Sequence, residues 1–269
     1  MSIPTISVII AAYRSQGFIT EAVKSALAQR IREVEIIVAP DEPVDYGFLG
    51  KLDPRVRVLD GVASPTGPGP ARNRALGVAR GRFIALLDAD DAWSDGYLSL
   101  LLPLAEQCGT AFGRTCLTDS EGRILREIGA REGEVVFDTF ATAFGSLHGV
   151  TRRPRQPVRC WHDVLAEDVL FDLESLALCG GRAPFAAEAV YRLNHRPQSM
   201  TRSAEFVAGI GADYGRLMAM VAAGETLVAP EHRPAVNAVW RSWQAMNARF
   251  VASGAPDYQN FVAALLSEQ

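Results

Sequence analysis

Short apolar strands alternate with helical segments through the first hundred residues, and this alternation restricts the folds open to the chain. Strands are predicted at 6–12, 34–38, 56–59 and 83–87. An apolar helical stripe covers 18–27, and a second helix is predicted around 71–79, after a Gly/Pro-rich loop at 65–70. Strands that are apolar on both faces need helices on both sides, so we predict an α/β fold with a mostly parallel sheet sandwiched by helices.

The rest of the chain is less regular and predicts a mixed sheet followed by helices. A hairpin is predicted from 111 to 127 around the turn Asp119–Gly122, which makes the sheet mixed. The further predictions are a helix at 137–144, an Arg/Pro-rich loop at 149–160, a helix at 165–178 ended by Gly180–Gly181, and a strand at 187–193. From residue 203 onward we predict two or three amphipathic helices with breaks near Pro230 and Gly254. The expected organisation is one α/β domain over 1–202 with a helical extension, 203–269, packed on it.

Composition predicts a globular protein of the reducing cytoplasm. The chain has 269 residues, of which 48% are hydrophobic, and a net charge of −4, so it offers no general basic field for nucleic acid. Its four cysteines show no CxxC spacing, which argues against zinc and favours reduced thiols. No signal-peptide pattern and no run of 18 apolar residues is present, so we expect peripheral membrane contact at most.

Three carboxylates follow the strand at 83–87, in the stretch FIALLDADDAW. Asp88 and Asp90 are two residues apart, so on an extended segment they project to the same side, where a divalent cation would relieve their repulsion. Carboxylate oxygens suit Mg²⁺ or Mn²⁺. In open α/β sheets ligands bind beyond the carboxyl ends of strands, which favours this reading over a solvated turn in which Asp91 caps the next helix.

Four stretches together resemble the family 2 glycosyltransferases of the GT-A fold, in chain order and at the usual spacing. They are ISVIIAAY near the N-terminus, EIIVAPDEP at 35–43, GPGPARNRALGVARG at 67–81 and FIALLDADDAW, and the resemblance covers roughly residues 4 to 200. It implies a nucleotide-diphosphate-sugar donor, a divalent metal (Mn²⁺ or Mg²⁺) held by the Asp-x-Asp motif, and inversion at the anomeric carbon. The implied acceptor is a saccharide or a lipid-linked saccharide, in surface polysaccharide or glycolipid synthesis.

The resemblance also implies roles for residues of this chain. Asp90 is the expected metal ligand, and Asp88 is expected near the ribose or the donor sugar as a second metal ligand, with Ala89 between them. The nucleotide-base pocket is expected to be formed by Ala11, Ala12, Tyr13, Asp41 and Arg72. Taken singly, Arg72 is also compatible with a surface salt bridge and Asp41 with a turn. A UDP-sugar is the favoured donor, but the family's Asp-Asp-Gly-Ser stretch is replaced here by Pro40–Pro43, so the nucleobase stays open.

Inversion also needs a base for the acceptor hydroxyl, and an acidic pair at 167–168 matches the family's pair. We predict Asp168 as the base with Glu167 as the fallback, although acidic residues are favoured in a first helical turn in any case. The segment YRLNHRPQSMTRS, 191–203, resembles the family's loop over the donor diphosphate, where His195 and Arg196 are expected. Arg152, Arg153, Arg155 and Arg159 are expected near the acceptor or in solvent.

Other classes of protein are less compatible with these patterns. A nucleotidyltransferase is expected to have a Gly-rich loop with Arg or Lys after the first strand, and residues 11–15 lack it. A phosphatase with an Asp-x-Asp nucleophile carries the motif after the first strand. A non-catalytic nucleotide-sugar-binding protein shares most of the residues, and the predicted base Asp168 is what argues for an enzyme. An apolar stripe at 236–251 is expected to pack on the domain rather than lie on a membrane.

Overall fold

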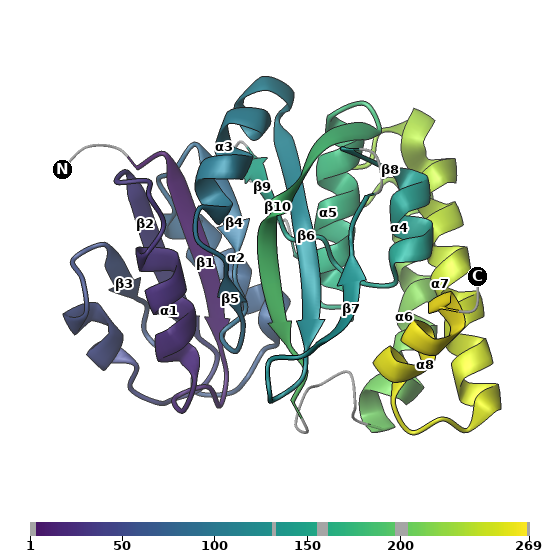
Figure 1. Cartoon of the computed structure of the whole chain (residues 1–269), viewed down its shortest axis with the longest axis horizontal. Coiled ribbons are helices and arrows are strands. Elements are labelled where there is room, and N and C mark those ends of the chain that lie inside the picture. Colours follow the sequence, from purple (N-terminus) through teal and green to yellow (C-terminus); the bar gives the residue numbers. More distant parts are fainter. Residues whose placement is uncertain (1–3, 131–132, 155–160, 197–203, 268–269) are drawn as a thin grey trace.

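The computed structural model describes residues 4–130, 133–154, 161–196 and 204–267 (Figure 1). Its ten-stranded sheet has the order β3-β2-β1-β4-β9-β6-β10-β5, with β7 on β6 and β8 on β10. The first four strands in the chain are β1 (Ile6–Ala12), β2 (Val34–Pro40), β3 (Val56–Val58) and β4 (Phe83–Leu86). They pair in parallel, with Ile6 opposite both Val34 and Phe83, so their carboxyl ends lie at one edge.

The second half of the sheet is mixed. It contains β5 (Ala92–Trp93), β6 (Thr110–Thr118), β7 (Ile124–Ile128), β8 (Glu134–Val136), β9 (Gly149–Arg152) and β10 (Arg182–Asn194). β6 and β10 are parallel to each other, whereas β5, β7, β8 and β9 pair antiparallel. The predicted mixed sheet and the hairpin of β6 and β7 are therefore confirmed.

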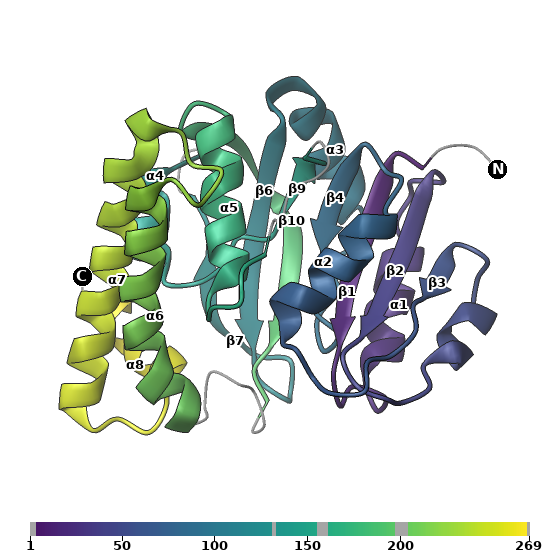
Figure 2. The same cartoon turned by 180° about the vertical axis from the view of Figure 1, so that it is seen from behind.

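Helices cover both faces of the sheet, which explains why the first strands are apolar throughout. α1 (Ile19–Leu27) and α3 (Tyr97–Cys108) pack with Ile6, Val8 and Ile10 of β1. α2 (Pro68–Val78) packs on the opposite face with Ile9, and Figure 2 shows α2 and α5 (Glu167–Leu178) in front of the sheet there. Alternate side chains of β1 thus enter two separate cores.

The C-terminal helices complete a further core at one end of the sheet (Figure 1). This core joins α5 to α4 (Phe137–Ala143), α6 (Ala204–Ala223), α7 (Arg233–Ser253) and α8 (Tyr258–Ser267). The stripe predicted to pack inward is buried, with Trp240 fully enclosed and Trp243 donating its indole hydrogen to the carbonyl of Phe140 at 2.7 Å. Among the described residues no helix is long and apolar enough to cross a membrane.

Several predictions along the chain were wrong. Residues 149–152 form β9 rather than loop, because Val150 and Thr151 bring a β-branched pair into the gap between β4 and β6. α3, β5, β8 and the short 3₁₀ helices Gly47–Lys51 and Pro230–His232 were not predicted. α2 begins at Pro68, inside the predicted loop, because proline is well suited to a first helical turn.

Candidate active site

The predicted site residues collect where β1, β2 and β4 end. Tyr13 follows β1, Asp41 follows β2, and Asp88 follows β4 two residues after its last strand residue. The start of α5, with Glu167 and Asp168, approaches the same edge through α2. Sequence segments that are far apart therefore meet where ligands bind in open α/β sheets.

Asp41 holds the loop that leads into α2. Its carboxylate accepts hydrogen bonds from the Thr66 amide (2.9 Å), the Thr66 hydroxyl (2.7 Å) and the Gly67 amide (2.7 Å), and the residue is 3% exposed. Gly67 has φ 94°, a left-handed value that glycine adopts without steric cost. In this structure the Asp41 carboxylate holds a loop 25 residues further along the chain rather than a local turn, and its contact with a nucleobase stays a prediction.

Arg72 lies buried between the two acidic motifs. Its Nη2 donates to Asp88 Oδ1 at 2.6 Å, and its Nη1 donates to Glu167 Oε1. Burial alone would lower the pKa of Arg72, but the charges of Asp88, Glu167 and Asp168 outweigh it and raise that pKa. Arg72 is therefore no surface salt-bridge residue, and in this structure its guanidinium joins carboxylates; its contact with a nucleobase stays a prediction.

A glycine allows this contact between α2 and α5. A Cβ built on Gly69 would lie 2.5 Å from the carbonyl oxygen of His162 and 3.4 Å from Glu167 Cγ. Any larger residue at this position would push α2 away from the segment before α5. The close approach brings Arg72, one turn further along α2, to Glu167.

The three aspartates after β4 have different environments. Burial opposes ionisation of Asp88, but the charges of Arg72 and His148 lower its pKa. Burial and the charge of Asp88 raise the pKa of Asp90, against the opposing effect of Arg196. Burial and its two aspartate neighbours raise the pKa of Asp91 well above its ordinary value.

Asp91 does not cap the following helix. α3 begins at Tyr97 with Gly96 as its N-cap. Asp91 is buried and accepts hydrogen bonds from the Asn194 amide at 2.8 Å and from the Tyr191 hydroxyl. The same hydroxyl accepts from the Asp88 amide at 3.0 Å. β10 therefore fixes residues 88–91, which we call the acidic loop.

A divalent cation between Asp88 and Asp90 stays a prediction, and it would need further ligands from outside the chain. Within the described residues there is no group of three or more His, Cys, Asp or Glu side chains arranged around a metal position. Burial raises the pKa of Asp90 most and the charge of Asp88 raises it further, and a cation would relieve the repulsion between the two carboxylates. Two carboxylates that leave further positions to water and phosphate are typical of magnesium sites.

Glu167 and Asp168 occupy unlike positions at the start of α5. Burial raises the pKa of Glu167 to about 7, although the charge of Arg72 opposes this. Asp168 is partly exposed, and its negative charge acts on Arg72, Glu167 and His148. Glu167 is thus engaged by Arg72 while Asp168 remains the more accessible carboxylate.

His148 was not predicted, yet it lies beside these carboxylates. Its ring stacks on Tyr191 with centroids 3.7 Å apart, and its Nδ1 is 3.4 Å from Thr115 Oγ1. Burial lowers the pKa of His148, whereas the charges of Asp88 and Asp168 raise it. Its φ of 46° is uncommon outside glycine, and its carbonyl accepts from the Tyr97 hydroxyl. The β-branched pair Val150–Thr151 is the sequence feature that could have predicted this position. A strand at these residues places His148, just before β9, at the site.

The first strand's end forms a mostly open rim. Tyr13 is 46% exposed, and the Arg14 guanidinium lies 5.0 Å from its ring centroid. Ala12 and Ala89 are buried, and Ala11 is partly buried. Tyr13 is therefore the exposed member of this set, and contacts of Tyr13 and the alanines with a nucleotide stay predictions.

The residues after β10 lie on the acidic loop. Arg196 Nη2 donates to the Asp90 carbonyl at 3.0 Å, and its guanidinium lies 4.1 Å from the Phe18 ring centroid. His195 is buried, with Nε2 2.9 Å from Asp257 Oδ2. A contact of either side chain with phosphate or metal stays a prediction, and residues 197–203 of this predicted loop lie outside the described residues.

The predicted acceptor arginines are placed elsewhere. β9 runs antiparallel to β4, with Arg152 opposite Phe83 at the start of β4. Arg153 donates its amide hydrogen to the Arg82 carbonyl at 2.8 Å. Both arginines therefore lie at the sheet edge opposite Asp88, and the exposure of Arg152 is compatible with the solvated alternative. A contact of either arginine with the acceptor stays a prediction, and Arg155 and Arg159 lie outside the described residues.

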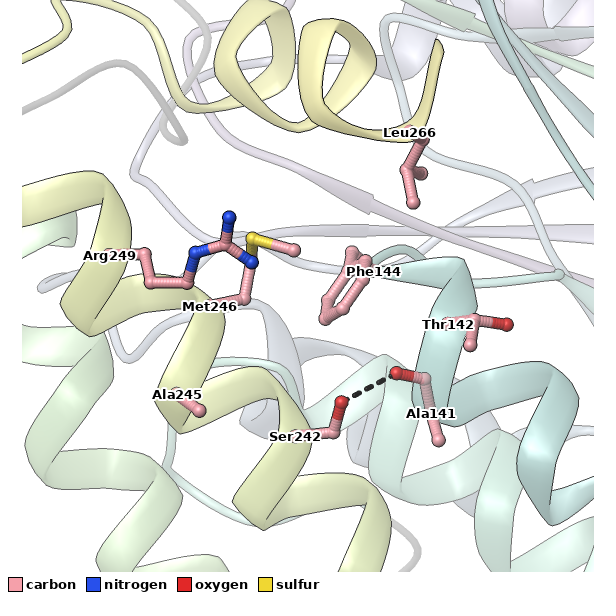
Figure 3. Close-up of a pocket in the computed structure, with 8 residues that line it drawn as sticks. All are labelled: Ala141, Thr142, Phe144, Ser242, Ala245, Met246, Arg249 and Leu266. Atoms are coloured by element: carbon pink, nitrogen blue, oxygen red, sulfur yellow. Dashed lines mark hydrogen bonds between the residues drawn. The ribbon is translucent and has the colours of Figure 1, made fainter. Parts of the chain in front are cut away.

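A pocket of about 260 Å³ lies apart from this site, between α4, α7 and α8 (Figure 3). Its lining residues are Ala141, Thr142, Phe144, Ser242, Ala245, Met246, Arg249 and Leu266. None of them is acidic, and none belongs to the predicted site. The pocket is mainly apolar and has no carboxylate or imidazole that could hold a metal.

Comparison with known proteins identifies the family. Residues 7–136 match the model of Glycosyl transferase family 2. The chain is 31% identical over 222 residues to the succinoglycan biosynthesis protein ExoO of Rhizobium meliloti, an alignment covering 74% of this chain and 63% of ExoO. It is 30% identical over 133 residues to a Campylobacter jejuni GalNAc(5)-diNAcBac-PP-undecaprenol beta-1,3-glucosyltransferase, covering 48% of this chain and 43% of that protein. Residues 7–136 are thus the part of the chain that glycosyl transferase family 2 describes, and the chain spans less than two thirds of the length of these two relatives.

Solved structures confirm the fold. Staphylococcus aureus TarS 1–349 in complex with UDP-GlcNAc has a TM-score of 0.57 at 17% identity, covering 98% of this chain and 92% of that chain. The Pyrobaculum calidifontis mannosyltransferase PcManGT in complex with GDP-Man and Mn²⁺ has a TM-score of 0.60 at 16% identity. The match covers 99% of this chain and 79% of PcManGT. The predicted GT-A fold, a mixed sheet flanked by helices with further helices at the C-terminus, is therefore confirmed.

Proposed function

We propose that this protein is an inverting glycosyltransferase that moves a sugar from a nucleotide-diphosphate sugar to an acceptor hydroxyl. The observation that carries the proposal is the Arg72 bridge, whose two nitrogens bind Asp88 and Glu167. It joins the acidic loop after β4 to the start of α5, 95 residues from Arg72 along the chain. A donor-binding motif and a predicted base are thus held in one site.

Asp168 is the base in this proposal. It is partly exposed at the start of α5, whereas its neighbour Glu167 is buried and bound to Arg72. A carboxylate with access to solvent is able to take the proton of an acceptor hydroxyl as that oxygen attacks the anomeric carbon. Ala166 precedes this pair with φ 62°, a left-handed conformation that is uncommon for alanine and fixes the entry into α5.

Asp90 and Asp88 are the proposed metal ligands. Arg72 holds Asp88 from one side, and Asn194 and Arg196 hold the backbone of Asp90 through its carbonyl oxygen. A bound Mg²⁺ or Mn²⁺ would stabilise the charge that develops on the leaving nucleoside diphosphate. The PcManGT complex with Mn²⁺ supports a metal at this site.

UDP is the proposed nucleotide, and a lipid-linked saccharide is the proposed acceptor. UDP is supported by TarS 1–349, whose structure is in complex with UDP-GlcNAc. A lipid-linked acceptor is supported by the name of the Campylobacter relative, which includes a saccharide on diphosphoundecaprenol. ExoO supports a place in surface polysaccharide synthesis. With such an acceptor, sugar transfer would take place in the cytoplasm at the inner face of the membrane. The proposed domain organisation is a catalytic domain of residues 1–202 with residues 203–269 as an extension packed on it.

A thermal-shift panel tests the proposal. The purified protein is mixed with UDP-, GDP-, ADP- and dTDP-sugars, each with and without Mn²⁺. A ligand that binds the native state raises the melting temperature, so we expect a UDP-sugar to raise it only with Mn²⁺. Release of nucleoside diphosphate from the bound donor then separates an enzyme from a non-catalytic nucleotide-sugar-binding protein. Absence of any shift across the panel would contradict the proposal.

A further inference from the structure

The last helix of the chain binds the segment that follows β10. His195 Nε2 lies 2.9 Å from Asp257 Oδ2, and each side chain is only 4% exposed. An ionised carboxylate only accepts, so with Asp257 ionised Nε2 donates in this bond. Asp257 is the residue before α8, and its other oxygen accepts from the Asn260 amide at 3.0 Å. One carboxylate therefore starts α8 and holds His195.

The two neighbours of His195 bind the acidic loop. Asn194 donates its amide hydrogen to Asp91 Oδ1 at 2.8 Å and its side-chain hydrogen to the Asp90 carbonyl at 2.6 Å. Arg196 donates to the same carbonyl at 3.0 Å. The His195 amide donates to the Thr118 carbonyl at 2.7 Å, which continues the pairing of β10 with β6. A change in the position of His195 would therefore be transmitted to the backbone of Asp90 from both sides.

A second anchor holds α8 independently of His195. Arg126 Nη2 donates to Gln259 Oε1 at 3.0 Å and to the Phe144 carbonyl at 3.0 Å. Arg126 lies on β7, which pairs with β6 and is separate from the acidic loop. Loss of the Gln259 contact would loosen α8 but leave the bond between Asp257 and His195 in place.

We propose that Asp257 is a positioning residue for the glycosyl transfer, acting through His195 on the acidic loop. The inference rests on the proposed function. A buried carboxylate bound to one ring nitrogen fixes the orientation and tautomer of a histidine. The bond is enclosed, so no solvent replaces it when it is lost. Asp257, 62 residues from His195 along the chain, thus supports the backbone of Asp90, the proposed metal ligand.

The test compares Asp257→Ala, Asp257→Asn and His195→Asn with the control Gln259→Ala. Each variant is assayed for donor KM, kcat and the Mn²⁺ concentration at half-maximal rate, at a temperature where circular dichroism shows it to be fully folded. We expect Asp257→Ala to raise the Mn²⁺ requirement or the donor KM on the order of tenfold. Asp257→Asn keeps an acceptor for Nε2 and should recover part of the loss. The double variant of Asp257 and His195 should be no worse than the Asp257 variant, because that variant already lacks the contact that the two side chains share.

The outcomes separate a positioning role from a structural one. Gln259→Ala is expected to lower the melting temperature with unchanged kinetic constants. If Asp257→Ala behaves in the same way, α8 is a structural element and the inference is wrong. A parent protein that binds no donor and transfers no sugar would instead contradict the proposed function, since that result does not depend on Asp257.

Discussion

Replacing Glu174 by glutamine should stabilise the protein and flatten the dependence of its stability on pH. Glu174 lies on α5, where it is 1% exposed. Its Oε1 accepts from the Leu227 amide at 2.9 Å, whereas its Oε2 is buried without a hydrogen-bond partner among the described residues. Burial raises the pKa of Glu174 from 4.5 to about 8, against the lowering effect of that one bond. The carboxyl group is therefore mostly protonated in the folded protein at neutral pH and ionised in the unfolded chain.

The pH dependence of the free energy of unfolding follows from the difference between the folded and unfolded pKa of Glu174. A folded-state pKa above the unfolded value gives stability that is complete below about pH 4.5 and is lost as the pH rises through about 8. Each pH unit inside that window lowers the free energy of unfolding by about 1.4 kcal/mol through this group. The Glu174→Gln variant lacks the titration, so its stability relative to the parent should rise by about 3 to 4 kcal/mol between pH 5 and pH 8.

Urea unfolding followed by circular dichroism at pH 5, 6, 7 and 8 measures this difference. Glu225→Gln is the matched control, because Glu225 is an exposed carboxylate in the same loop as Leu227. Its stability should follow that of the parent at every pH. A Glu174→Gln variant whose stability relative to the parent does not change with pH would refute the assignment of a protonated, buried Glu174.

Three predictions concern the site. Asp168→Asn should keep donor binding but lower kcat by a factor on the order of 10² to 10⁴, whereas Glu167→Gln should lower kcat less. Steady-state kinetics at saturating Mn²⁺ measure both effects. A near-parental rate for Asp168→Asn would remove the base assignment. Asp90→Ala should keep the fold and lose Mn²⁺-dependent donor binding, which calorimetric titration measures; parental affinity would exclude Asp90 as a ligand. His148→Asn, chosen because asparagine tolerates a left-handed backbone, should lower sugar transfer on the order of tenfold to hundredfold by freeing Tyr191, and an unchanged rate in the folded variant would contradict this.

Local patterns were sufficient to predict the framework of the fold. The strands at 6–12 and 34–38 and the helices of the C-terminal region follow from periodicity and from breaks such as Gly254, which has a φ of 67°. β9 escaped prediction because it has four residues and continues into arginines and prolines. α3 contains Pro103, which weakens any helical pattern. Short or interrupted elements are specified by the neighbours on which they pack, and a local pattern contains little of that information.

The candidate site was predictable only as far as strand ends and motif order allow. Those features indicated the acidic loop and the pair Glu167–Asp168. The contacts of Arg72 and of His195 depend on residues 95 and 62 positions away, and no spacing rule predicts which partner a buried charged group finds. Arg72 was expected at a nucleobase because its position matches the family, whereas in this structure its charge is compensated by two carboxylates.

The central claim is that this site transfers a sugar with inversion, and the anomeric configuration of the first product tests it most directly. The parent protein is incubated with Mn²⁺ and an α-linked UDP-sugar selected from the thermal-shift panel, and proton NMR follows the sugar released to water or to an acceptor. We predict that the β-anomer appears first and that Asp168→Asn suppresses its formation. An α-anomer as the first product, or turnover that is unchanged in Asp168→Asn, would contradict the account.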